Sequence, residues 1–313
     1  MFLLAIVLSA KADIADEVAI PVPWVSGECI DERFPKISGD WVVGCKGRGT
    51  ITRAWNLRGR FGVQFEAMGT HPALSGGLII DFESGLVVDL NTDSCLVPNG
   101  SVCTAIPSQP LNTAIVGPYH MNGDSVSVTL REGVSFFTYG SNQREVLAAN
   151  PSSWYPSAVG SGWVAWTEPS TESGVERGMF WSREIVTPVE IGNREENVRH
   201  LTSSGGYLAW VEDSSVVISR VTDGELATET RISSDAHTSS GLSLNGGVAC
   251  WESWGEGVDV ECSDGRSVGG DGHQRYPSHN DDWLIYRVDG VTMVEVFVVA
   301  SGVNQQEANE PLD

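Results

Sequence analysis

Short apolar runs alternate with turn-forming residues along most of this chain. The runs are four to eight residues long and rich in Val, Ile, Trp and Tyr, and clusters of Gly, Asp, Asn and Ser separate them. Such runs predict β-strands, because β-branched and aromatic side chains favour extended backbone and the separating residues favour tight turns. The 3.6-residue apolar period of amphipathic helices is absent. The pattern therefore predicts an all-β fold.

One motif returns throughout the sequence: a turn, an aromatic or aliphatic residue, two small apolar residues and usually a tryptophan. Its copies are 37, 47, 38, 44, 41 and 35 residues apart, and in the fifth copy we expect strands at residues 201–204, 207–210, 216–221 and 228–232. A period of about 40 residues with about four strands is typical of β-propeller blades. We therefore predict a seven-bladed β-propeller whose second strands begin at Trp41, Leu78, Ser125, Trp163, Tyr207, Val248 and Trp283.

The last copy is incomplete, because the polar residues 301–313 offer no fourth strand. A strand-like stretch at residues 18–25 precedes the first copy, and its two prolines are tolerated on an edge strand. We predict that this stretch forms the outer strand of the last blade and closes the ring, which removes exposed sheet edges. The predicted organisation is a signal peptide at 1–12, a closing strand and linker at 13–33, a propeller at 34–300 and a polar tail at 301–313.

Copies that read aromatic-Pro-x-x-Ser/Asn-Gly-Asp-Trp-Val-Val, most fully at residues 34–43, resemble the TolB-like family of bacterial propeller repeats. The resemblance covers residues 34–300 and implies a propeller fold in an envelope or extracellular setting. The family includes binding scaffolds and some enzymes, so the resemblance implies no single activity. The resemblance also implies that a histidine-bound metal site is an option, because some sugar-acid lyases with TolB-like propellers use one.

The N-terminus predicts export from the cytoplasm. Residues 2–8 form an apolar run, and Ala10 and Ala12 provide a small-x-small site for signal-peptide cleavage after Ala12. The alternative is a buried first strand in a cytosolic protein. No later stretch is long and apolar enough to span a bilayer as a helix, so we expect no membrane insertion and a secreted or periplasmic location.

Six cysteines also favour an oxidising compartment. Local pairing is geometrically the cheapest of the fifteen connectivities, because short hairpins bring the paired positions together. Metal ligation is the competing use, and no Cys-x-x-Cys pair is present for it. The predicted disulfides are Cys29–Cys45, Cys95–Cys103 and Cys250–Cys262.

The net charge of −22 argues against nucleic acid and anionic membranes as partners, because an acidic surface repels phosphate groups. It favours a cationic ligand, a basic protein or divalent cations, and solubility is the simpler explanation. We expect no organic cofactor, and a divalent cation is the alternative left open.

Candidate site residues lie in or beside connectors between blades, or at the ends of second strands. Both positions approach the same face of a propeller, where histidines and carboxylates could hold a metal or perform acid–base chemistry. No His-Glu-x-x-His, P-loop, calcium-loop or nucleophile-elbow motif occurs. The candidate ligand-binding residues are His71, His200, His237, His273, Glu168, Glu212 and Glu252, with His120 and His279 on or near first strands.

The leading functional hypothesis is a secreted, non-catalytic propeller that binds a protein or a glycan through an acidic loop face. The first alternative is a carbohydrate-active lyase or hydrolase with a His/acidic site at the channel mouth. The second is a structural subunit of an envelope or surface assembly.

Overall fold

Every regular element in the described part of the chain is a β-strand, which confirms the predicted all-β class. The computed structural model describes residues 20–21, 36–46, 51–57, 61–66, 73–80, 87–91, 119–130, 133–139, 144–152, 157–170, 175–233, 241–255, 257–270, 272–288 and 291–296.

These strands form antiparallel sheets, which we number along the chain. Sheet 1 contains β2 (Lys36–Ser38), β3 (Trp41–Lys46), β4 (Ile51–Asn56) and β5 (Phe61–Glu66). Sheet 2 contains β6 (Ala73–Ser75), β7 (Leu78–Ile80) and β8 (Val87–Asp89). Sheet 3 contains β9 (Tyr119–Asn122), β10 (Ser125–Leu130), β11 (Gly133–Thr138) and β12 (Arg144–Ala148).

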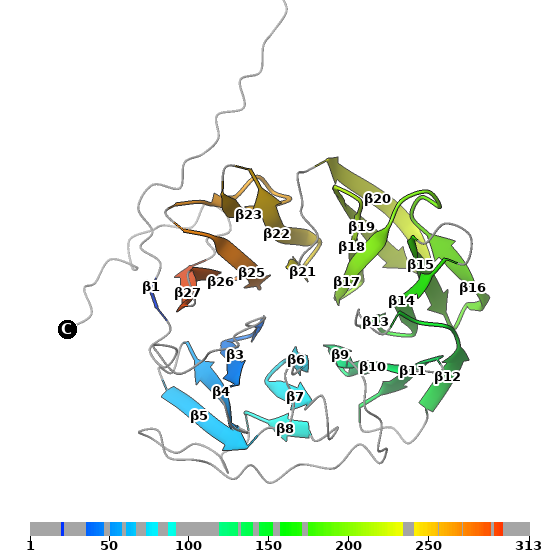
Figure 1. The fold of residues 1–313 in the computed structure, drawn as a ribbon. Coiled ribbons are helices and arrows are strands. Elements are labelled where there is room, and N and C mark those ends of the chain that lie inside the picture. Colours follow the sequence, from blue (N-terminus) through cyan, green and yellow to red (C-terminus); the bar gives the residue numbers. More distant parts are fainter. Residues whose placement is uncertain are drawn as a thin grey trace, which may run out of the picture.

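The second half of the chain repeats this arrangement, and Figure 1 shows the sheets standing around a common centre. Sheet 4 contains β13 (Ala158–Gly160), β14 (Trp163–Pro169), β15 (Glu176–Ser182) and β16 (Ile185–Ile191). Sheet 5 contains β17 (Val198–Ser204), β18 (Tyr207–Glu212), β19 (Ser215–Thr222) and β20 (Glu225–Ser233). Sheet 6 contains β21 (Leu242–Asn245), β22 (Val248–Trp254), β23 (Val258–Cys262) and β24 (Ser267–Val268). Sheet 7 contains β25 (Gln274–His279), β26 (Trp283–Val288), β27 (Val291–Val296) and β1 (Ile20–Pro21).

Sheet 7 joins strands from the two ends of the described chain. Ile20 pairs with Val294 and Pro21 pairs with Met293, so β1 is the outer strand beside β27. Proline is acceptable there because an edge strand needs only one of its two sides for hydrogen bonds.

The fifth copy tests the predicted strand limits. All four predicted strands lie within β17 to β20, but each observed strand is longer. The added residues are mainly polar, such as Arg199 and Glu225, and they pair because the ladder continues beyond the buried apolar positions. Apolar patterning therefore locates the centre of each strand better than its ends.

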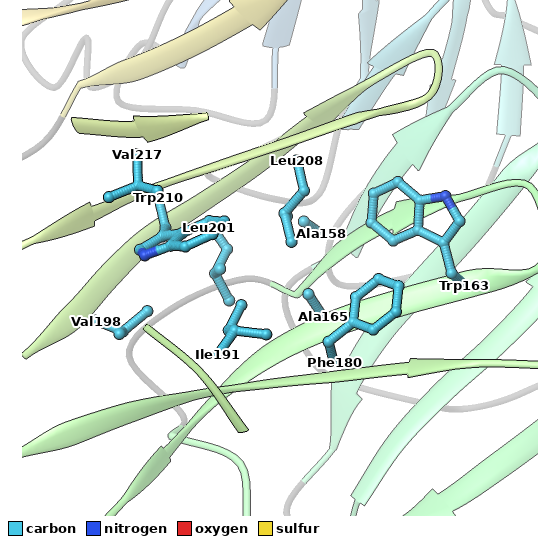
Figure 2. Close-up of a cluster of buried hydrophobic side chains, with 10 residues drawn as sticks. All are labelled: Ala158, Trp163, Ala165, Phe180, Ile191, Val198, Leu201, Leu208, Trp210 and Val217. Carbon is cyan, nitrogen blue, oxygen red and sulfur yellow. The ribbon is translucent and has the colours of Figure 1, made fainter. Parts of the chain in front are cut away.

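Apolar side chains fill the spaces between consecutive sheets. Figure 2 shows the cluster between sheets 4 and 5, where the rings of Trp163 and Phe180 lie 5.8 Å apart and Trp210 is 1% exposed. Ile37 and Val42 of sheet 1 pack with Ile285 of sheet 7 in the same way. Burial of each such side chain contributes roughly 1.5–3 kcal/mol, so the contacts between sheets are a main source of stability.

The first strands are also linked by hydrogen bonds between sheets at the turns that follow them. The amide N–H groups of Gly76 and Gly123 donate to the hydroxyls of Ser38 and Ser75 in the preceding sheets (2.7 and 3.0 Å). Asn122 of sheet 3 exchanges two hydrogen bonds with the backbone of Gly205 in sheet 5 (3.1 and 3.0 Å).

The remaining links return to sheet 1. Ser204 donates to Asn245 (3.4 Å), Asn245 donates to Asp281 (2.7 Å), and Asn280 donates to the carbonyl of Gly39 (2.6 Å). We call this circuit the turn belt; its side chains are Ser38, Ser75, Asn122, Ser204, Asn245, Asn280 and Asp281.

Sheet 4 contributes no side chain to the turn belt. Gly160 occupies the equivalent position, and a Cβ there would lie 2.2 Å from the indole of Trp163. Only glycine fits under this ring. The bonds between Asn122 and Gly205 therefore connect sheets 3 and 5 directly, past the end of the first strand of sheet 4.

One of the three predicted disulfides lies within the described residues. Cys250 and Cys262 are directly paired across β22 and β23 and form a buried disulfide, which confirms that pair. Cys29, Cys95 and Cys103 lie outside the described residues, so the other two pairs remain predictions.

The turn belt yields a stability prediction. Asn122→Ala removes both hydrogen bonds to Gly205, so we expect the free energy of unfolding to fall by about 1–2 kcal/mol. Asn150→Ala is the matched control, because this exposed side chain makes no described hydrogen bond, and its effect should stay within about 0.5 kcal/mol. Urea denaturation followed by tryptophan fluorescence measures both, and equal effects would contradict the role of Asn122.

Candidate functional site

A pocket of about 310 Å³ lies at the ends of the first strands, beside the turn belt. Residues from sheets 1, 2, 3, 5, 6 and 7 line it, and we call it the mouth pocket. Ile37, Leu74, Met121 and Leu244 supply its apolar surface. Its polar surface is formed by Ser38, Ser75, Asn122, Ser203, Ser204, Asn245, His279, Asn280, Asp281 and Asp282.

Serine, asparagine and aspartate precede or form the turns in this region, and their sequence pattern indicates only turns. The structure gives these residues a second role, because their side chains point to a shared pocket as well as to the neighbouring sheet. The sequence signal that could have located the pocket is the repeated Ser or Asn immediately before the Gly or Asp of the turn.

The candidate glutamates lie at the opposite ends of the second strands. Glu212 ends β18, and Glu168 and Glu252 lie within two residues of the ends of β14 and β22. All three are buried, and each accepts a hydrogen bond from a backbone N–H of a connector or of the next first strand.

Glu212 shows what these carboxylates do. It is fully buried and accepts hydrogen bonds from the Trp210 indole (3.2 Å), from Arg231 (2.7 Å) and from the Asn193 N–H. Residues two apart in a strand face the same side, which brings Trp210 and Glu212 together. The carboxylate thereby ties the connector before β17 to two strands of sheet 5.

Glu168 repeats this arrangement in sheet 4. The Trp166 indole donates to Glu168 (2.9 Å), and Arg177 forms an ion pair with it (2.9 Å). In sheet 6 the glutamate follows its tryptophan directly, as Trp251-Glu252, so the two side chains face opposite sides. Glu252 accepts from the Tyr276 N–H instead (2.9 Å), and the buried Trp251 indole N–H has no partner among the described residues.

The candidate histidines do not gather at one place. His200 lies at a β-bulge in β17 with φ of 51°, in the left-handed region, and Tyr276 occupies the corresponding bulge in β25 with φ of 58°. His273 is exposed just before β25, and sheet 6 stands between it and His200. His71 and His237 lie outside the described residues.

Two other histidines on first strands contact serine hydroxyls of other sheets. The His120 ring lies 3.0 Å from the Ser203 hydroxyl, and the His279 ring lies 2.8 Å from the Ser243 hydroxyl. Burial, followed by the charge of Lys36, lowers the pKa of His120 to about 3. Burial, followed by the charge of Arg266, lowers the pKa of His279 to about 4. Both rings are therefore neutral at physiological pH.

Within the described residues, no group of three or more His, Cys, Asp or Glu side chains is arranged to hold a metal ion. No helix in the same part of the chain has the length and apolarity required to cross a membrane.

A comparison with protein-family models and with curated proteins found no match to this sequence. Solved structures do match. A catalytically inactive virginiamycin B lyase from Staphylococcus aureus, determined with quinupristin, has a TM-score of 0.55 at 12% identity over 90% of this chain and 99% of that chain. The β-propeller domain of Cps50 from Myceliophteria thermophila has a TM-score of 0.56 at 14% identity over 88% and 98%.

This chain has a β-propeller fold. An acylaminoacyl peptidase from Pyrococcus horikoshii also matches, with a TM-score of 0.57 at 11% identity over 86% of this chain and 52% of the peptidase. At these identities the likeness shows the fold alone, and the matched propellers include enzymes as well as other proteins.

The buried carboxylates generate a second stability prediction. Glu212→Ala leaves the Trp210 indole, the Asn193 N–H and part of the Arg231 charge without an acceptor, so we expect a loss of about 2–3 kcal/mol. Glu190→Ala is the control, because Glu190 pairs with a largely exposed Arg194, and its effect should stay below about 1 kcal/mol. Urea denaturation at pH 7 compares them, and a similar small loss for both would refute the structural role of Glu212.

The low pKa of His279 predicts a loss of stability in acid. In the unfolded chain this histidine has an ordinary pKa of about 6.5, whereas in the folded chain it is about 4. Between these values the unfolded chain binds more protons, so stability falls as the pH falls, by up to about 3 kcal/mol. We expect His279→Gln to lose correspondingly less stability between pH 7 and pH 4 than the wild type. Identical losses in urea denaturation across this range would disprove the assignment.

Proposed function

We propose that this protein is a closed seven-bladed propeller with β1 in its last blade. Seven sheets are present in the described residues, and β1 pairs with β27. The turn belt returns to sheet 1, and sheet 7 packs against sheet 1. The TolB-like resemblance of its repeats supports the same architecture.

We propose that the chain is exported. The apolar residues 2–8 and the small-x-small site at Ala10 and Ala12 support a signal peptide at residues 1–12, which lie outside the described part. The buried Cys250–Cys262 disulfide supports an oxidising location, secreted or periplasmic.

We propose that the protein is a non-catalytic binding module and that the mouth pocket is its binding site for a protein loop or a glycan. The observation that carries this proposal is the mixture of apolar side chains with hydroxyl, amide and carboxylate groups around one pocket. The turn belt fixes several of these groups before any ligand arrives, and preorganised groups bind with a smaller entropic cost.

The acidic character of this end suits the same proposal. Asp281 and Asp282 line the mouth pocket, and Asp40 and Asp124 lie in neighbouring turns. From the sequence alone, we expect the binding face at the connectors on the opposite side. We place it at the turns because the pocket lies there, while Glu168, Glu212 and Glu252 bond to strands and connectors.

The titratable groups favour binding over acid–base catalysis. A general acid or base works best when its pKa is close to the working pH. His279 lines the mouth pocket with a pKa of about 4, and its ring contacts the Ser243 hydroxyl. The proposed role of these groups is therefore structural and ligand-contacting.

Occlusion of the mouth pocket tests the proposal. Leu74 lines the pocket, so Leu74→Trp would narrow it with a larger side chain without removing a side chain of the turn belt. We expect at least about a tenfold loss of affinity, equivalent to about 1.4 kcal/mol, for the glycan or protein that the wild type captures. Binding partners are sought on a glycan array and by pull-down of exported proteins, and affinities are measured by calorimetry.

Val146→Trp is the control, because Val146 is 59% exposed on the outer strand β12, and its affinity should match that of the wild type. Unchanged affinity in Leu74→Trp would reject the mouth pocket as the site. Turnover of a bound glycan would instead support the carbohydrate-active enzyme, and a stable multimer in light scattering would support the structural subunit.

A further inference from the structure

The first strands lack the acidic residues that are abundant elsewhere. The protein contains 41 aspartates and glutamates, but β2, β6, β9, β13, β17, β21 and β25 contain none. These seven strands do contain basic side chains, and they lie around the centre in Figure 1. Apart from the phenols of Tyr119 and Tyr276, the titratable side chains of these strands are all basic: Lys36, His120, Arg199, His200, Arg275 and His279.

Lys36 is the lysine of these strands. The strand register fixes its distance along the strand from the turn, which we call its level. It pairs with Val43, two residues before the turn, and His120 and Thr202 hold the same position in sheets 3 and 5. Lys36, His120 and Thr202 are each partly accessible to solvent. The residues at this level are Lys36, Ala73, His120, Ala158, Thr202, Ser243 and Ser278.

The Lys36 ammonium makes no hydrogen bond or ion pair within the described part of the chain. Burial lowers its pKa from the ordinary value of 10.5. Burial of a charge without a counter-charge raises the free energy of the folded protein. The Lys36 amine must therefore either release its proton or acquire an anionic partner.

The neighbouring strands supply no such partner. Of the strands packed against β2, β25 carries Arg275 and His279, β26 carries Arg287, β3 carries Lys46, and β6 has no charged residue. Arg275 lies over the Trp254 ring at 5.2 Å. The Lys36 charge lowers the pKa of His120, so this histidine stays unprotonated at neutral pH and supplies no charge of its own.

Two hydroxyl-bearing residues hold the same register position as Lys36 in other sheets. Ser278 accepts a hydrogen bond from the N–H of Ile37, the residue next to Lys36 (3.1 Å), which holds this hydroxyl beside β2. Thr202 offers a second hydroxyl from sheet 5. One cation together with hydroxyl donors matches a ligand that carries one negative charge on two acceptor oxygens.

We propose that the interior of the ring binds a small carboxylate anion at Lys36, with the Ser278 and Thr202 hydroxyls as further donors. A monovalent carboxylate fits better than a divalent phosphate, because a second negative charge would remain uncompensated. Lys36 does not line the mouth pocket, so this site is separate from the one proposed above and does not depend on it.

The three lysines of the chain permit a direct test. Reductive methylation with 13C-formaldehyde of the chain without the proposed signal peptide at residues 1–12 labels Lys36, Lys46 and the N-terminal amine, and NMR then follows each amine separately. Acetate should shift the Lys36 resonance saturably and raise its pKa, because the anion stabilises the protonated amine. The resonances of Lys46 and the N-terminus should move no more than in chloride of equal ionic strength.

Substitution provides the second readout. Acetate should raise the thermal unfolding midpoint of the wild type and of Lys36→Arg, because a ligand that binds the folded state stabilises it. In Lys36→Gln the affinity for acetate should fall at least about tenfold, or 1.4 kcal/mol. Removal of an unpaired charge leaves this variant able to fold, and Lys46→Gln is the matched control.

Any of three results would overturn the proposal. The site is refuted if acetate and chloride act equally on the Lys36 resonance, or if Lys36→Gln retains the acetate response. The carboxylate class is rejected if inorganic phosphate binds more tightly than acetate at pH 7.

Discussion

The inner edge of every sheet must find hydrogen-bond partners outside its own sheet. A first strand pairs on one side only, so the backbone groups on its other side need partners from outside the sheet. Neighbouring sheets supply the partners: the N–H groups of Ile37, Val159 and His279 donate to the hydroxyls of Ser278, Ser203 and Ser243. This requirement explains why serine and asparagine are frequent on strands that form the centre of the protein.

The same requirement shapes the site. The hydroxyl and amide groups that satisfy the inner edges also line the mouth pocket, so structure and recognition use the same residues. Sheet 4 is the exception, because its first strand carries Ala158, Val159 and Gly160 and all three are buried. Sheets 3 and 5 approach each other in front of it through Asn122 and Gly205.

The fold was largely predictable because apolar patterning at a regular spacing specifies strands and their repetition. The strand centres of the fifth copy and the disulfide between Cys250 and Cys262 were predicted, since both depend on local geometry. The roles of the glutamates were not. From the sequence we predict that Glu212 binds a ligand; its hydrogen bond from the Trp210 indole follows from their spacing of two in a strand. The pocket requires six sheets to meet, and the repeated Ser or Asn before each turn marks the lining residues without showing that they converge.

The position of β1 has a consequence for biosynthesis. Its partner β27 ends at Val296, so the strands of all the other sheets must be synthesised before Ile20 can pair with Val294. Until then β1 has no strand partner, and unpaired strands attract other chains. The topology therefore creates an interval during synthesis in which a chaperone could shield the segment that is made first.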